Sequence, residues 1–586
     1  MTEFLKVITE RVLILDGAMG TLLQERGLSP GGCPEEMNRN APDVVIGIHA
    51  AYAEAGADVL IANSFGGNRV KLANYNLGNA VDELNRRAVA LARKSAPAGV
   101  FVGGSVGPTG RFVEPVGDAG FDEMIDIFAE QISSLVGAGA DLISFQSFLD
   151  IRELRAGVIA CRDVCNLPVI AQMTFDDASR TVLGTPPSAA AVTLDALRVD
   201  VIGANCGLGI DGIHDVLAEM RQVTPRPLIA QANAGLPTLR NGQTLFPGTP
   251  EEMTAYDERL IALGVRVVGG CCGTTPRHIR VMRDALNNYP QGWCPPPRRG
   301  FLSSRSGVAE FGGETPCALI GERINPTGKK GYTEELRAGK TAYIRREAAA
   351  QVAAGADLLD LNCGAPGVDE AAALERAVYA ASGASPVPLV IDTSDPIALE
   401  KALMAADGKV LINSVNGEAN SLARVLPLAR RYGAALIGLT LDEDGIPGTA
   451  EGRVAVARRI HHAVLSAGLH EQDLVIDCLT LTVSAEQKRA LETLRTLRLV
   501  RDQLGLATAL GISNISFGLP SRPVLSSVFF AMALEAGLKV AIINPRDKRM
   551  MDAYHSAMGI LGHDLRAENY IADYADQAMP AQPVAS

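Results

Sequence analysis

The sequence is poor in aromatic residues, which make up 5% of its 586 residues and include a single tryptophan. It also lacks an excess of basic residues, because 54 Lys and Arg stand against 66 Asp and Glu, a formal net charge of −12. Nucleic-acid binding needs a basic face, so this balance argues against such a partner. No apolar run is long enough to span a bilayer, which argues against a membrane protein.

Two further features are missing. The ten cysteines do not follow the spacing of a disulfide framework. The first residues, MTEFLKVITERVLILDG, carry acidic residues early and lack the layout of a secretory signal peptide. Together these absences predict a chain that works in the reducing cytoplasm.

What the chain does contain is a repeated unit of helix, short turn and apolar strand. The unit appears as HAAYAEAGADVLIANSF (49–65) and recurs at 135–148, 197–207 and 260–273. Its strands are apolar throughout, as in a parallel sheet that helices cover on both faces. About eight such units fit between residues 12 and 290, which predicts a TIM (β/α)8 barrel. A doubly wound sheet is the alternative, but no GxGxxG follows an early strand.

The rhythm breaks between residues 291 and 315, where proline, glycine, serine and arginine accumulate, and we expect a linker there. Eight more strand-plus-loop units follow it. The predicted fold class is therefore α/β, with two consecutive TIM barrels over residues 1–290 and 316–575. The last stretch, 576–586, is small and polar and is typical of a flexible tail, as at the start of a connection to something longer.

Three cysteines occupy similar places at the ends of predicted strands. Cys271 and Cys272 follow an apolar run and two glycines, and Cys206 follows the run VDVIGAN. The carboxyl ends of the strands form the active-site face of a TIM barrel, so the three thiolates can bind one zinc ion and leave a fourth position open. The alternatives are a redox-active or structural vicinal pair, or simply buried thiols.

An open zinc site of three thiolates suits one kind of chemistry in particular. Bound zinc lowers the pKa of a substrate thiol and holds it as a nucleophilic thiolate, ready for alkylation. A bound water would instead indicate a hydrolase, but no HxE or HExxH pattern accompanies the cysteines. The sequence therefore favours activation of a thiol.

Five motifs lie at strand ends and loops of the first barrel: DGAMGT (16–21), NSFGGN (63–68), GANCG (203–207), NAGLP (233–237) and GGCCGTTP (269–276). Over residues 10–290 they resemble the homocysteine-binding methyltransferase family. The resemblance implies zinc bound by Cys206, Cys271 and Cys272. It also implies that the loops around Asp16 and Asn233 bind the amino-acid substrate.

One position departs from that family. Its members usually carry Glu-Thr where this chain has Gln146-Ser147, and the resemblance associates this place with the amino group of homocysteine. A neutral amide removes a charged partner, although the Gln146 carbonyl can still accept a hydrogen bond. The departure leaves thiol methylation intact and leaves the thiol open between homocysteine and another acceptor.

Acidic and amide side chains end most strands of the second barrel, including Glu322, Asn325, Asp360, Asn362, Asp392, Asn413, Asn416, Asp477 and Asn514. This lining suits a neutral heterocycle with several hydrogen-bonding positions, because a carboxylate can accept two N–H donors from an aminopyrimidinone. Each acid could instead cap the helix that follows it. The recurrence at so many strand ends favours a binding site.

The second barrel carries GERINPTG (321–328), DLNCGAP (360–366), IDTS (391–394), INSVNGE (412–418) and SNISFGLPSR (513–522). These motifs resemble the pterin-binding family, and within it the branch that binds methyltetrahydrofolate rather than the dihydropteroate synthases, whose lysine-bearing motif is missing. The resemblance implies that the pterin is bound by Glu322, Asp392, Asn413, Asp477 and Asn514. It places Asn514 near N5, with Asn514 and Asp477 as the catalytic residues.

The order of the two barrels resembles the N-terminal half of the cobalamin-dependent methionine synthases. That resemblance implies methyl transfer from 5-methyltetrahydrofolate to a corrinoid, and from the corrinoid to the zinc-activated thiol. The cobalt-ligand motif DxHxxG is missing, since the nearest string, DAYHSAMG (552–559), has the wrong spacing. We therefore expect cobalamin, or another corrinoid, to be supplied by a domain or protein outside this chain.

Three alternatives remain open. The acceptor could be a different thiol, which the amide at Gln146 leaves possible. A single donor such as a betaine could methylate the thiol directly, although an intact pterin site argues against it. The chain could also be a non-catalytic module that binds folate and docks a corrinoid protein.

Overall fold

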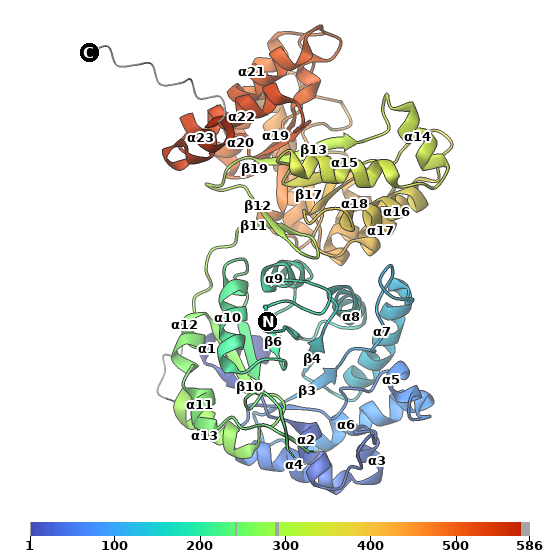
Figure 1. Ribbon diagram of the computed structural model, residues 1–586, viewed down its shortest axis with the longest axis vertical. Coiled ribbons are helices and arrows are strands. Elements are labelled where there is room, and N and C mark those ends of the chain that lie inside the picture. The colour runs from blue at the N-terminus through green and yellow to red at the C-terminus, as the bar shows by residue number, and fades with distance from the viewer. Residues whose placement is uncertain (1, 241–242, 288–291, 576–586) are drawn as a thin grey trace, which may run out of the picture. The chain divides into compact units, whose positions relative to one another are not determined.

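The computed structural model describes residues 2–240, 243–287 and 292–575, which separate into two compact units, each with one βα-barrel (Figure 1). The first unit comprises most of the chain up to Arg298, and the second most of the chain from Arg299 onward. The predicted tail, 576–586, lies outside the described residues.

The first unit contains one sheet of eight parallel strands in the order β1-β10-β7-β6-β5-β4-β3-β2. The strands are β1 (Leu13–Ile14), β2 (Val59–Ile61), β3 (Phe101–Val106), β4 (Leu142–Phe148), β5 (Val169–Met173), β6 (Val201–Asn205), β7 (Leu228–Ala232) and β10 (Val265–Gly270). Its two edges meet through a parallel bridge between Leu15 and Val59, and Asp16 N donates to Val59 O at 3.0 Å. These contacts close the sheet into a barrel.

Helix α1 (Glu3–Glu10) covers the amino-terminal ends of these strands. Its Phe4 and Ile8 are buried in the core that the strand residues form, and the Phe4 ring packs edge-on against Phe101, the first residue of β3. The connecting helices are α2 (Met19–Glu25), α3 (Met37–Asn40), α4 (Pro42–Glu54), α5 (Arg69–Ala73), α6 (Val81–Ser95), α7 (Phe121–Gly137), α8 (Ile151–Val164), α9 (Pro187–Ala196), α10 (Ile210–Arg221), α11 (Pro250–Thr254), α12 (Asp257–Ala262) and α13 (Pro276–Leu286). Because α1 occupies one end, the other end, where the strands' carboxyl ends lie, is the one on which barrels of this class place their functional residues.

The second unit contains a closed parallel barrel with its strands in sequence order. They are β13 (Ala318–Ile324), β14 (Leu358–Leu361), β15 (Leu389–Asp392), β16 (Leu411–Asn416), β17 (Ala435–Leu439), β18 (Leu474–Asp477), β19 (Ala507–Gly511) and β20 (Val540–Ile543). The helices are α14 (Lys330–Arg337), α15 (Ala342–Ala353), α16 (Glu370–Ser382), α17 (Pro396–Ala405), α18 (Ala419–Tyr432), α19 (Ala450–Ser466), α20 (Lys488–Leu504), α21 (Arg522–Glu535), α22 (Lys548–Ile560) and α23 (Glu568–Tyr574). Two consecutive TIM barrels are thereby confirmed.

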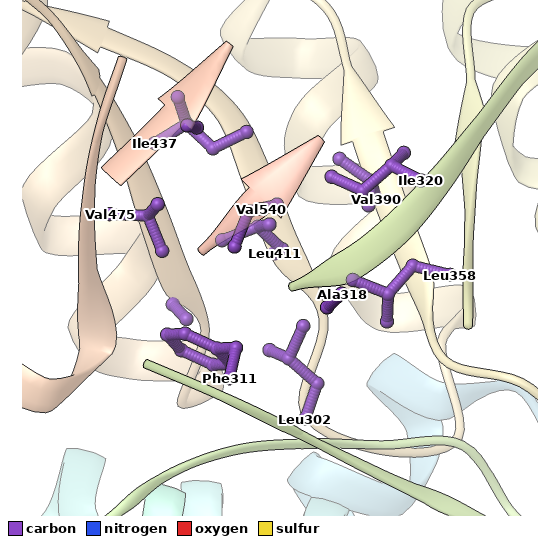
Figure 2. Packing of buried hydrophobic residues seen from close by; sticks show 12 residues of the cluster. Leu302, Phe311, Ala318, Ile320, Leu358, Val390, Leu411, Ile437, Val475 and Val540 are labelled. Carbon is purple, nitrogen blue, oxygen red and sulfur yellow. The ribbon is translucent and has the colours of Figure 1, made fainter. Parts of the chain in front are cut away.

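Part of the expected linker is ordered as an antiparallel hairpin, β11 (Gly300–Ser303) with β12 (Val308–Phe311). Its Leu302 and Phe311 are buried in the core of the second barrel, beside residues that begin β13 and β20 (Figure 2). Ser303 N also donates to the carbonyl of Lys409 at 3.0 Å. The hairpin therefore closes the amino-terminal end of this barrel, as α1 does in the first. No described helix is long and apolar enough to cross a membrane.

Candidate active sites

Cys206, Cys271 and Cys272 meet at the carboxyl ends of β6 and β10. Their Sγ atoms all lie within 4.8 Å of one another, with 3.8 Å between Cys206 and Cys272. Cys206 has a φ of 59°, which side-chain-bearing residues rarely adopt, at the point where the chain leaves β6. Within the described ranges, this is the one group of His, Cys, Asp or Glu side chains with metal-ligand spacing.

Neighbouring amides hold the cysteine loops in place. Asn233 Oδ1 accepts a hydrogen bond from Cys272 N at 3.1 Å. Asn205, directly before Cys206, donates from Nδ2 to Ser147 Oγ at 2.9 Å and accepts from Ser147 N at 2.8 Å. The sequence-predicted residues Ser147 and Asn233 thus lie beside the cluster, and Asn205 connects Ser147 to it. Hydrogen bonds from two neighbouring thiols lower the pKa of Cys206.

A cavity of about 300 Å³ borders the cluster. Its lining includes all three cysteines together with the predicted residues Asp16, Gln146 and Ser147. The lining also contains residues that the sequence patterns do not single out, among them Glu35, Ser105 and Gln231. Among the described residues of this lining, the acidic ones are Asp16 and Glu35, and none is a Lys, Arg or His. The cavity therefore offers sulfur and oxygen ligands and negative charge.

Two of the polar side chains expected to contact the substrate, Asp16 and Gln146, are held differently. Asp16 follows β1, is 3% exposed, and accepts a hydrogen bond from Ile61 N through Oδ2 at 2.9 Å. Burial raises its pKa well above the usual range. Gln146 is neutral, accepts from Ser105 Oγ at 2.9 Å and donates to Gln231 Oε1 at 3.1 Å. Asp16 is therefore the one member of the pair that can carry a charge, and burial makes that charge costly unless a cation is bound beside it.

Of the predicted pterin residues, two end their strands, Asp392 in β15 and Asp477 in β18. Glu322 and Asn413 lie within β13 and β16, and Asn514 lies in the short 3-10 helix 512–516 after β19. Each carboxylate is tied to a neighbour. Asp392 accepts from Asn362 Nδ2 at 2.9 Å, and Asn413 donates from Nδ2 to Asp360 at 3.3 Å. Glu322 accepts a hydrogen bond at 2.8 Å from the hydroxyl of Ser513, which is the residue before Asn514. Asp477 accepts one from Leu479 N at 2.7 Å.

These carboxyl groups share an unusual electrostatic state. Burial raises the pKa of Glu322, Asp360 and Asp392, and the nearby Asp392 carboxylate raises that of Asp360 further. Burial also raises the pKa of Asp477 to about 6. The barrel mouth thus holds carboxyl groups that gain a partner when a ligand brings N–H donors to them.

Asp477→Asn should stabilise the protein at pH 7. A carboxyl group whose pKa rises on folding stabilises the fold below its unfolded value of 3.8 and loses that contribution as the pH rises through about 6. The shift corresponds to about 3 kcal/mol at pH 7, and asparagine removes the penalty while still accepting from Leu479 N. Urea unfolding at pH 4 and pH 7 measures this effect. The free energy of unfolding of the variant should exceed that of the wild type at pH 7 only.

The exposed Asp444→Asn provides the control, because an exposed surface change alters stability by less than about 0.5 kcal/mol. If Asp477→Asn changes the free energy of unfolding by the same amount at both pH values, the argument from burial is wrong.

An open three-cysteine cluster in one barrel and an acid- and amide-rich mouth in the next define a two-site protein. Residues 13–286 match the homocysteine S-methyltransferase family, and residues 321–544 match the pterin binding enzymes. Each barrel thus matches the family that its own motifs resemble.

Two methionine synthases are similar to the chain along most of its length. The chain is 32% identical to the methionine synthase of Mycobacterium tuberculosis over 607 residues, covering 97% of this chain and 51% of that protein. It is also 32% identical to the methionine synthase of Mycobacterium leprae over 611 residues, covering 97% of this chain and 50% of that protein. The chain thus spans about half the length of these relatives. A metallated homocysteine methyltransferase from Escherichia coli aligns with 47% of this chain and 96% of its own, at 24% identity and a TM-score of 0.41.

Proposed function

We propose that the chain carries the two methyl-transfer sites of a methionine synthase. The second barrel transfers a methyl group from 5-methyltetrahydrofolate to a corrinoid, and the first transfers it from the corrinoid to a thiol, homocysteine, giving methionine. The observation that carries the proposal is the cysteine cluster, which borders a cavity large enough for a small thiol and lies in the same chain as a pterin-binding barrel. The corrinoid comes from a domain or protein outside the chain.

In this proposal the first barrel, with its domain at 1–290, activates the acceptor. Cys206, Cys271 and Cys272 would hold zinc, since three sulfurs at this spacing, half-buried and open to a cavity, match an open zinc site. Bound zinc would supply the Lewis acidity that keeps a substrate thiol deprotonated. Asn233 fixes the Cys272 backbone, and Asp16, Gln146 and Ser147 form the substrate-facing wall.

The second barrel, with its domain at 316–575, would prepare the donor. Glu322, Asp392 and Asn413 bind the pterin by hydrogen bonds, and Asp477 and Asn514 act at the reacting end. When the methyl group leaves, its bonding electrons stay on N5, which must gain a proton or a strong hydrogen bond. The Asn514 amide is the donor in this proposal, with the proton drawn from water held by the carboxyl and amide groups.

A second acceptor is also supported by a specific observation. Gln146 is an amide held by Ser105 and Gln231, so this position brings no charge to an amino group. A thiol without an amine, methylated by the same relay, is the alternative acceptor.

Two half-reactions test the proposal on the full chain. Zinc-loaded protein should methylate homocysteine from free methylcobalamin, and should demethylate 5-methyltetrahydrofolate onto free cob(I)alamin, each faster than the same mixture without protein. Removal of the metal with a chelator should abolish only the first. If neither half-reaction exceeds the rate without protein, the chain is not this methyltransferase.

A further inference from the structure

An amino-acid thiol bound in the first cavity needs a negative partner for its ammonium group. Position 146 does not provide one, because Gln146 is a neutral amide. Its carbonyl accepts from Ser105 Oγ, and its Nε2 donates to Gln231 Oε1. Gln231 in turn donates from Nε2 to the carbonyl of Gly270 at 3.3 Å. These residues all line the cavity, so this part of its wall is neutral.

The direction of this hydrogen-bonded chain is fixed at one end. A backbone carbonyl can only accept, so Gln231 must turn its Nε2 toward Gly270 and its carbonyl toward Gln146. Gln146 must then present Nε2 to Gln231, which leaves its carbonyl for the Ser105 hydroxyl. The geometry orients both amides, and neither of them brings a negative charge to an ammonium group.

The cavity has one more carboxylate besides Asp16. Glu35 lies in the loop before α3, is 4% exposed and lines the same cavity. Its Oε1 accepts from Gly66 N at 2.6 Å, and its Oε2 accepts from Cys33 Sγ at 3.4 Å. A Cβ atom on Gly66 would lie 3.1 Å from Glu35 Oε1, so the glycine permits this close approach. The wall is therefore shaped around the Glu35 carboxylate.

No described side chain forms an ion pair with that carboxylate, and the charge of Lys71 offsets the effect of burial on its pKa only in part. Across the described part of the chain, neither Glu35 nor Asp16 forms an ion pair, and burial raises the pKa of both. A buried carboxylate without a cation is costly, and a ligand cation offsets the cost. Two such groups in one cavity, with no Lys, Arg or His in its lining, complement a small cation.

We propose that Glu35, with Asp16, binds the ammonium group of the substrate, so that the first barrel selects a thiol with a primary amine. The assignment rests on the proposed function, which places the thiol in this cavity. It gives position 35 the charged role that Gln146 does not fill, and it favours homocysteine over a thiol without an amine.

Titration calorimetry on the zinc-loaded full chain tests this inference with two ligands. Homocysteine and 4-mercaptobutanoate have the same thiol, carbon chain and carboxylate, and only the first has the amine. Glu35→Gln should weaken homocysteine binding by about tenfold or more, the effect of losing a charge-assisted hydrogen bond, and should leave 4-mercaptobutanoate binding unchanged. Glu35→Asp, which keeps the charge, should show a smaller loss.

Glu36→Gln is the matched control, because Glu36 is the next residue, does not line the cavity and pairs with Arg39. It should leave the affinities for both thiols at the wild-type values. Unchanged 4-mercaptobutanoate binding also shows that the Glu35→Gln site is folded. Equal effects of Glu35→Gln on both thiols, or no effect on either, overturn the assignment. If the wild-type protein binds neither thiol, the proposed function itself is wrong.

Discussion

Cys272→Ala should abolish methylation of homocysteine and leave the demethylation of 5-methyltetrahydrofolate unchanged. The Cys272 sulfur lies 3.8 Å from that of Cys206, and removing it leaves two sulfurs, too few for a stable zinc site. The lost Lewis acidity is worth several kcal/mol, so the thiol half-reaction should fall on the order of 10³-fold. The second barrel has its own core and keeps its rate.

The measurement pairs bound zinc with the two half-reaction rates. Cys165→Ala is the matched control, since Cys165 is also half-buried and its sulfur also lies 3.8 Å from another cysteine sulfur, that of Cys161, outside the cluster. The control should keep one zinc and both rates. A Cys272→Ala protein that keeps its zinc and methylates homocysteine normally would remove this cluster from the mechanism.

The convergence of the three cysteines was predictable from the sequence for a physical reason. Parallel strands of a barrel all end on one face, so a residue at a strand's carboxyl end is placed by the fold and not by its neighbours in sequence. Cys206 and Cys271 stand 65 positions apart and still meet, because β6 and β10 are separated only by β7 in the sheet. The same rule placed Glu322, Asp392 and Asp477 at one mouth.

Two features escaped prediction because they lie outside that rule. Glu35 stands in a loop, where its run Pro-Glu-Glu reads as the start of a helix and no periodicity aims its side chain at the cavity. The hairpin of residues 300–311 stands in a stretch whose prolines, glycines and serines are typical of a linker. Only tertiary burial of Leu302 and Phe311 distinguishes it, and a short strand carries little signal of its own.

Pairing between strand ends also had to come from the structure. The sequence places Asp360 and Asp392 at strand ends. It does not predict that Asn413 donates a hydrogen bond to Asp360, or that Asn362 donates one to Asp392. A strand-end pattern fixes which face a side chain occupies and leaves its rotamer and partner open. The hydrogen-bonded run from Ser105 through Gln146 and Gln231 is of the same kind.

Asn514→Ala should slow the demethylation of 5-methyltetrahydrofolate by about 10²- to 10³-fold, the usual effect of removing one donor aimed at developing charge. Folate affinity should change only a few-fold, because in the proposed site Glu322, Asp392 and Asn413 would still bind the ring. Methylation of homocysteine from free methylcobalamin should be unaffected. Single-turnover rates and equilibrium folate binding separate the two effects.

The choice of asparagine has a physical basis. An amide donates a hydrogen bond at any pH without adding a charge that would stabilise the ground state, so a bond from Asn514 to N5 would strengthen only as N5 gains electron density. Asn569→Ala, an exposed asparagine of the same unit that bonds Asp564, is the control and should keep the wild-type rate. If folate affinity instead falls as far as the rate, Asn514 binds the pterin equally in both states, and the proton reaches N5 by another route.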